Sequence, residues 1–146
     1  MQNKIYKPKL DWLFHVIWIP TVILLAVCTV ISFTAWPALL IMLATDIFTL
    51  YFLVSPLVGY VELRENTVFI RYGFILTREI EYLRIREMKK ERKFYSETML
   101  SLKNSMEHIT VKYNKFDVTT VSVTDNDDLM MNIRARIEAK RINSEI

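Results

Sequence analysis

A nearly uncharged stretch of about 50 residues does most to limit how this chain can fold. Between Trp12 and Val61 the only formally charged residue is Asp46, whereas charges recur every few positions from Glu62 onward. The hydrocarbon core of a membrane is about 30 Å thick, and roughly 20 apolar residues span it as a helix. The stretch therefore predicts two membrane-spanning helices joined by a tight turn. The averages of 52% hydrophobic and 24% charged residues then combine an apolar anchor with a water-soluble domain.

The turn between the two helices is predicted at residues 35–38, where the sequence reads Ala-Trp-Pro-Ala. Pro37 has no backbone N–H with which to continue a preceding helix, but it suits the first turn of the next one. The predicted helices therefore cover residues 13–34 and 38–58.

A cleaved signal peptide is the competing interpretation of the N-terminal segment, because a basic start followed by an apolar stretch is its general pattern. It fits poorly. The apolar run is too long, has no convincing small-x-small cleavage site, and continues directly into a second predicted helix. We therefore divide the chain into a membrane anchor over residues 1–58 and a cytoplasmic domain over residues 59–146.

The residues that flank the anchor predict its orientation. Lysines precede the first helix and arginines follow the second, whereas the turn carries no charge. Because cytoplasmic loops are enriched in Lys and Arg, we expect a multi-pass membrane protein with both termini in the cytoplasm. Aromatic residues, which prefer the membrane surface, fall at the predicted ends as Trp12 and Tyr60 on one side and Trp36 on the other. The flanking bases are Lys4, Lys7, Lys9, Arg64, Arg71 and Arg78.

Asp46 is the residue of the anchor that hydrophobicity does not explain. An ionised carboxylate near the bilayer centre costs about 2.5–3.5 kcal/mol even on a lenient insertion scale, so it needs a partner or a proton. An antiparallel hairpin places residues 26–29 at its depth, which makes Thr29 a candidate partner, together with Thr45 and Thr49 on its own helix. Two interpretations stay open. A protonated Asp46 can join the two helices through hydroxyl or backbone hydrogen bonds, or Asp46 can contact another membrane protein or an inserting peptide.

Beyond Val61 the apolar residues recur at every second position, which is the pattern of half-buried strands. The segment 60–73 predicts a hairpin whose turn lies at Glu65-Asn66. We expect Gly73 to end the second strand and to permit the next turn, because glycine adopts positive φ without steric cost. A third strand is predicted over residues 74–80.

The following segments alternate less regularly. A strand is predicted over about 84–92, followed by a loop over 93–105 that includes a short strand near 100–102. A further hairpin is predicted from the alternation over 109–113 and the β-branched run over 118–123.

The C-terminal segment predicts an amphipathic helix. Thr124 is the predicted cap, with Asp127 as the reciprocal acid of a capping box. Leu129, Ile133 and Ile137 recur at four-residue spacing, so the helix has one narrow apolar stripe suited to closing one side of a sheet. The fold class is therefore α+β: a transmembrane helical hairpin, then about six or seven short strands forming a barrel or sheet like a pleckstrin-homology (PH) domain, capped by one helix.

The order of these elements resembles the bacterial PH-domain family, which includes an immunity protein against the bacteriocin sublancin in Bacillus. The likeness covers about residues 57–140. It rests on the alternating run Ile109-x-Val111-x-Tyr113, followed by a strand and then by Ser122-x-x-Asp125 before the helix. Val123 stands where relatives often have a proline after the serine. The resemblance implies a membrane-anchored PH-like domain, and it implies protection against a bacteriocin or envelope stress as one function.

Enzyme chemistry finds no support in the sequence. The chain has 2 glycines and no glycine-rich phosphate loop, no nucleophile elbow and no paired metal-ligand motif. Cys28 is the single cysteine, so it forms no disulfide framework. His108 opens an apolar strand and is interpreted as structural, while His15 lies near the membrane surface. We expect no catalytic residue, no cofactor and no metal, and the net charge of +3 is too small to indicate nucleic-acid binding.

The densest basic run supplies candidate contacts to anionic lipid, since each base near such a membrane surface is worth about 1 kcal/mol. Glu87 and Glu91 dilute the run, so a solvated mixed-charge face is the alternative. The candidate lipid contacts are Lys89, Lys90, Arg92 and Lys93.

Two functions follow as hypotheses. The first is a non-enzymatic binding module anchored in the lipid bilayer, which confers bacteriocin immunity or envelope-stress protection by meeting a bacteriocin peptide or a membrane protein. The second is a membrane scaffold or assembly factor, whose PH-like domain binds a protein partner by strand addition or groove packing.

Overall fold

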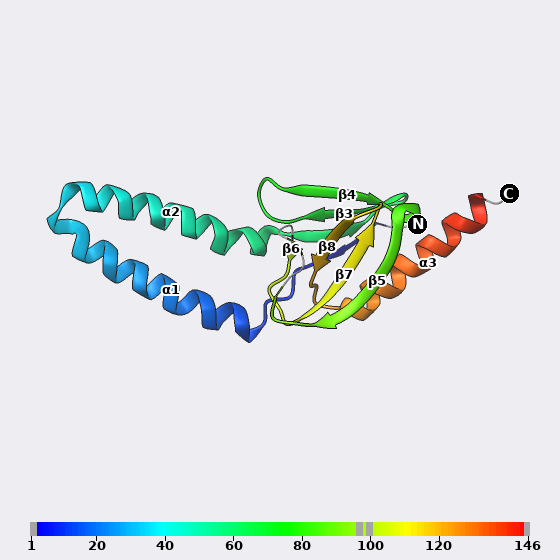
Figure 1. Ribbon diagram of the computed structural model, residues 1–146, viewed down its shortest axis with the longest axis horizontal. Coiled ribbons are helices and arrows are strands. Elements are labelled where there is room, and N and C mark those ends of the chain that lie inside the picture. The colour runs from blue at the N-terminus through cyan, green and yellow to red at the C-terminus, as the bar shows by residue number, and fades with distance from the viewer. Residues whose placement is uncertain (1–2, 96–97, 99–100, 145–146) are drawn as a thin grey trace.

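A computed structural model describes residues 3–95, 98 and 101–144 of the chain. Two long helices form a hairpin that projects from one end of a β-rich domain, and a third helix lies against the opposite side of that domain (Figure 1). The predicted α+β plan, with an apolar hairpin first and a helix last, is confirmed.

The hairpin consists of α1 (Trp12–Ile31), the short 3₁₀ turn η1 (Ser32–Thr34) and α2 (Trp36–Val58). Ala35 is the extended residue between them, with φ −132° and ψ 104°. Pro37 lies in the first turn of α2, where its missing N–H costs no helical hydrogen bond. The turn covers residues 32–35, so it meets the predicted segment 35–38 at Ala35 alone, and α2 begins two residues earlier than predicted.

Both helices expose apolar side chains on all sides. All residues of the two helices are described, and none of α1 is buried, while α2 buries Leu39 alone. A helix in the core of a soluble protein would bury at least one apolar stripe. Both helices are long and apolar enough to cross a membrane.

The first sheet contains four antiparallel strands in the order β1-β2-β3-β4. Its first strand was not predicted, because three residues beside Pro8 carry too little pattern. Lys4 pairs with Leu63 and Tyr6 with Val61, so β1 and β2 are direct neighbours although the whole helical hairpin separates them in sequence. The strands are β1 (Lys4–Tyr6), β2 (Tyr60–Leu63), β3 (Thr67–Arg71) and β4 (Thr77–Glu81).

The second sheet has the order β5-β7-β8-β6, with β6 parallel to β8 and the other pairs antiparallel. The short turn η2 (Tyr82–Arg84) leads into it from the first sheet. Within the described residues the two sheets form no closed barrel. They contain eight strands there, and β1 is the one beyond the six or seven that the sequence predicts. The strands are β5 (Ile85–Arg92), β6 (Ser101–Leu102), β7 (Glu107–Tyr113) and β8 (Asp117–Val121).

Helix α3 (Asn126–Ser144) closes the domain with its predicted apolar stripe. Leu129, Ile133 and Ile137 are all buried and belong to the same core as the inward-facing residues of both sheets. The largest fully buried core side chains include Leu63, Ile70, Ile80, Tyr82, Leu102 and Ile109.

The predicted cap of α3 was wrong by one residue. The Asp125 carboxylate, not the Thr124 hydroxyl, accepts a 3.0 Å hydrogen bond from the backbone N–H of Asp128. The Thr124 hydroxyl instead donates to the carbonyl of Lys7. Asp127 forms an ion pair with Lys90 rather than a capping box.

The predicted third strand also began too early. Residues 74–76 form a loop, and β4 begins at Thr77. Gly73 does not adopt positive φ. A Cβ at Gly73 would overlap the side chain of Ser55 on α2, so glycine is needed there for close approach and not for turn geometry.

Candidate functional site

Asp46 lies on the face of α2 that meets α1. The hydroxyl of Thr29 donates a hydrogen bond of 2.7 Å to the Asp46 carboxylate, so the first helix supplies a partner at the predicted depth. The Thr45 hydroxyl is used within α2, where it donates to the carbonyl of Ile41. The two helices thus share one directed polar contact in apolar surroundings.

A groove of about 240 Å³ opens beside this contact. Asp46 and Thr49 are its polar lining residues, and the rest of its lining is aliphatic. The groove thus places a carboxyl and a hydroxyl within an apolar surface, where they can accept a hydrogen bond from a donor group. The aliphatic lining residues are Val22, Leu25, Ala26, Leu50 and Leu53.

The lysines of the predicted basic run each lie beside an acid. Lys90 Nζ is 2.7 Å from an Asp127 carboxylate oxygen, and this pairing raises the pKa of Lys90. The corresponding distances are 2.8 Å from Lys89 to Glu87 and 3.0 Å from Lys93 to Glu91. The pKa of Glu91 is lowered mainly by its hydrogen bond with Lys93.

These acids offset much of the positive charge of β5. Arg92 is the exposed last residue of β5, and it pairs with Glu107 on β7. This pair lies at the end of the domain nearer the helical hairpin. The run is therefore not a uniform basic patch: Lys89, Lys90 and Arg92 belong to β5, and Lys93 follows its last residue.

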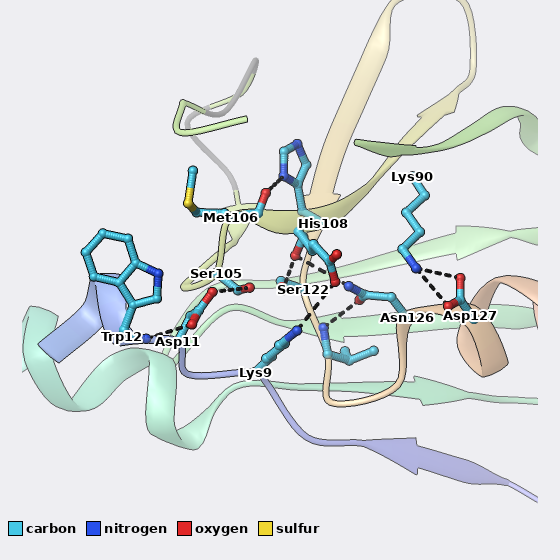
Figure 2. A network of polar contacts seen from close by, with 12 residues as sticks. Lys9, Asp11, Trp12, Lys90, Ser105, Met106, His108, Ser122, Asn126 and Asp127 are labelled. Carbon is cyan, nitrogen blue, oxygen red and sulfur yellow. Dashed lines mark hydrogen bonds and ion pairs between the residues drawn. The ribbon is translucent and has the colours of Figure 1, made fainter. Parts of the chain in front are cut away.

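A polar network at the start of α1 was not predicted from the sequence (Figure 2). The Asp11 carboxylate caps α1 by accepting a 2.7 Å hydrogen bond from the N–H of Trp12. The same side chain accepts from the Ser105 hydroxyl at 3.3 Å, and the Asp11 N–H donates to the Asn104 carbonyl. The first helix is thereby attached to the segment between β6 and β7.

A buried polar cluster continues this network into the second sheet (Figure 2). The Ser122 hydroxyl donates to the Glu107 carbonyl at 2.6 Å, and the Asn126 amide reaches the same carbonyl at 3.4 Å. The Lys9 N–H donates to the Ser122 carbonyl at 3.1 Å. Ser122 and Asn126 are both buried, so their hydrogen bonds fix the chain that leads into α1. Their spacing along the sequence gave no signal for this contact.

Each of the two histidines has a ring nitrogen close to a backbone carbonyl. His108 is buried in β7, its ring nitrogen lies 3.0 Å from the Met106 carbonyl, and burial lowers its pKa. Its other ring nitrogen is 3.9 Å from Glu91. A His15 ring nitrogen lies 3.2 Å from the Asp11 carbonyl in the first turn of α1. These contacts favour the structural interpretation of both residues.

Residues 59–137 match the bacterial PH domain, which is more than half of the chain. The chain belongs to the bacterial PH-domain family. The matched region begins directly after α2 and ends at Ile137, the last buried residue of the apolar stripe on α3. Comparisons with curated proteins and with solved structures found no match.

PH domains are in general non-catalytic modules that mediate binding to lipids or proteins. In this PH domain, β1 comes from before the matched region and completes the edge of the first sheet. The helical hairpin is thus inserted between two adjacent strands of the domain that it carries.

Proposed function

We propose that this protein is a non-enzymatic binding module that its helical hairpin anchors in the bacterial cell membrane. The observation that carries the proposal is the insertion of α1 and α2 between the neighbouring strands β1 and β2. Both helices are apolar around their circumference, and both connect to the PH domain through short segments. A bilayer that covers the hairpin would therefore hold the domain at its surface at two points.

Charge supports cytoplasmic termini. The segments at the domain end of the hairpin carry basic residues, whereas residues 32–36 at its turn carry none. The test uses alkaline phosphatase and a fluorescent protein, each fused to the C-terminus or inserted after Ala35. Cytoplasmic termini predict fluorescence from the C-terminal fusion and phosphatase activity from the insertion. The reverse pattern would contradict the orientation.

Asp46 with its groove is the proposed point of recognition within the membrane. A membrane-active bacteriocin peptide, or the membrane protein that it targets, would enter beside Asp46 and exchange the hydrogen bond of Thr29 for one of its own. Protection against such a peptide or against envelope stress is the physiological role that we propose.

Sensitivity of a deletion strain to membrane-active peptides tests this role. The deletion should increase sensitivity, and the wild-type gene should restore resistance. Asp46→Leu should fail to restore it at equal expression, whereas Thr45→Val should restore it, because the Thr45 hydroxyl bonds its own helix. Unchanged sensitivity of the deletion strain would contradict the proposed immunity role. Full resistance with Asp46→Asn would restrict the role of Asp46 to hydrogen bonding.

A scaffold or assembly factor is the second candidate, and the edge of the first sheet favours it. Strand β4 pairs with β3 on one side, and four of its five residues are exposed. Such an edge can accept a strand from a partner. Photocrosslinking from Arg78 should recover one specific protein if this candidate holds, with the same crosslinker at Glu138 as control. Recovery of the same proteins from both positions would oppose it.

Contact with anionic lipid is proposed for the part of the basic run nearest the hairpin. Arg92 and Lys93 occupy that end, whereas Lys90 is engaged by the first turn of α3. Native mass spectrometry of protein extracted from membranes should show less retained phosphatidylglycerol for Arg92→Gln than for Lys89→Gln. Equal retention would argue for a solvated face.

A further inference from the structure

Three consecutive apolar residues are exposed at the tip of the loop between β3 and β4. Phe74 is 43% exposed, Ile75 75% and Leu76 55%. A contiguous apolar tip on a surface loop usually marks a contact site, because it gains nothing from exposure to water.

The register of the first sheet places this loop beside the hairpin. Tyr60 pairs with Arg71 in the β2–β3 ladder, and Arg71 pairs with Thr77 in the β3–β4 ladder. Because Tyr60 follows α2 after one intervening residue, the β3–β4 turn must lie at the end of the sheet where α2 enters. Figure 1 shows the loop on that side of the domain, alongside the last turns of α2.

Side-chain contacts attach the loop to α2. The Ser55 hydroxyl lies 3.5 Å from the Tyr72 carbonyl, and Gly73 packs so closely against Ser55 that no Cβ fits. The ring of Phe74 lies 5.7 Å from the ring of Tyr51, one turn further back along the helix. The loop therefore follows α2 toward the middle of the hairpin and does not turn away from it.

Several polar backbone groups of the loop are bonded within the loop itself. The Arg71 guanidinium donates to the carbonyls of Gly73 at 2.7 Å and Phe74 at 3.3 Å. The Tyr72 N–H donates to the Leu76 carbonyl at 2.9 Å. Irregular backbone can enter an apolar medium only when its polar groups are satisfied in this way. These bonds lower the number of backbone polar groups that the tip must keep hydrated at a membrane surface.

Helix dimensions set the depth of the tip. Tyr51 precedes Val58, the last residue of α2, by seven residues, or about 10 Å at 1.5 Å per residue. The 23 residues of α2 extend about 35 Å, which exceeds a hydrocarbon core of about 30 Å by about 5 Å. Even if the whole excess lay on the domain side, Tyr51 would lie below the membrane surface. The ring of Phe74, 5.7 Å from the ring of Tyr51, then lies near the level of the acyl chains.

We propose that Phe74, Ile75 and Leu76 insert among the phospholipid acyl chains of the leaflet that faces the PH domain. The inference rests on the proposed membrane insertion of the hairpin. Together with α1 and α2 the loop makes a third attachment, which fixes how the PH domain is turned toward the membrane. A groove of about 220 Å³ between α2 and the loop, lined in part by Phe52, Ser55 and Leu76, gives an acyl chain room to pack there.

Depth-dependent quenching tests the insertion on the full chain. Cys28→Ser removes the native thiol, and single cysteines then replace Ile75, Phe116 or Ile47 for labelling with an environment-sensitive fluorophore. Phe116 is the matched control, because it is 84% exposed in the β7–β8 turn at the other end of the domain. Ile47, 71% exposed on α2, reports on the hairpin. The vesicles contain phosphatidylethanolamine, phosphatidylglycerol and a phospholipid with a nitroxide on its acyl chain.

The labels at positions 75 and 47 should lose most of their emission to the nitroxide lipid, while the label at 116 is quenched by aqueous iodide instead. If position 75 behaves like 116 while 47 is quenched by the lipid, the loop insertion is overturned and the proposed anchor stands. If all three labels respond to iodide alone, both are overturned. As a second measurement free of the label, p-benzoylphenylalanine at Ile75 should crosslink to phospholipid, and at Phe116 it should not.

Discussion

The hydroxyl of Thr29 donates a 2.7 Å hydrogen bond to the carboxylate of Asp46, which lies 17 residues further along the chain on the opposite helix. Lipid tails are as apolar as the surfaces of α1 and α2, so the hydrophobic effect does not drive two such helices together in a membrane. A directed polar bond therefore contributes to their pairing. It also keeps the carboxylate beside the groove and in a defined orientation.

Loss of this hydrogen bond should weaken the pairing of the two helices. Thr29→Val keeps the shape of the side chain and removes the donor, so the unfolding free energy in a bilayer should fall by about 0.6 kcal/mol and by no more than about 1.7 kcal/mol. Steric trapping in bicelles measures this quantity. Thr45→Val is the matched control, because its hydroxyl bonds the Ile41 carbonyl on the same helix. Equal losses from both variants would contradict a specific role for the Thr29 bond.

Gly73→Ala should destabilise the junction between α2 and the PH domain. The new Cβ would overlap the Ser55 hydroxyl, and overpacking of this kind costs about 1–3 kcal/mol. Thermal unfolding in detergent micelles, followed by near-ultraviolet circular dichroism, measures the loss. Ser55→Ala removes the atom nearest to the new Cβ and should recover part of the stability when combined with Gly73→Ala. Additive losses in the double variant would show that the clash lies elsewhere.

The role of Gly73 could not be predicted from the sequence. The prediction identified Gly73 as the end of a strand and assigned it positive φ, whereas the structure requires it for the approach of Ser55. Residues 74–76 were predicted as strand, because an apolar run beside alternating residues has the composition of a buried strand. Nothing local to that run reveals that α2 ends beside it. The contact follows only from the strand register, which the sequence does not specify.

Elements with a long or strong period were predicted well, and short ones were not. The turn near Pro37 and the apolar stripe from Leu129 to Ile137 follow from patterns that repeat over many residues. Strand β1 has three residues and finds its partner β2 more than 50 positions away, so its pairing leaves no local pattern. Thr124 and Asp125 are both residue types that favour helix N-caps. The sequence does not show which side chain reaches the backbone N–H of Asp128, and in the structure it is Asp125.

Stability should decrease in alkaline solution as buried tyrosines ionise. Burial raises the pKa of Tyr72 to about 12, and the pKa of Tyr6 is raised to about 12 as well, mainly by burial. The folded state therefore retains these protons above pH 10, where an unfolded tyrosine releases them, and stability falls as the pH rises from about 10 to 12. Chemical unfolding at a series of pH values should show a smaller slope for Tyr72→Phe. Tyr95→Phe, which alters an exposed tyrosine, should leave the slope unchanged.

Acid should release the N-terminal strand from α3. Asp128 accepts hydrogen bonds from Lys4 at 2.5 Å and from the Tyr6 hydroxyl at 2.6 Å, and these bonds lower its pKa, the Lys4 bond most. The folded state binds the ionised carboxylate better than the unfolded state does. The stabilisation is therefore present above the unfolded pKa of about 4, and it is lost as the pH falls through the lower folded value.

Hydrogen exchange of the β1 amides measures this release, because β1 is an edge strand and Asp128 attaches it to the helix. Exchange corrected for the intrinsic pH effect should accelerate below about pH 4 in the wild type. Asp128→Asn should show the faster exchange already at neutral pH and little further change in acid. Glu138→Gln, an exposed acid further along α3, is the control and should follow the wild type. If Asp128→Asn retained wild-type protection at pH 7, the carboxylate would not be what holds β1 in place.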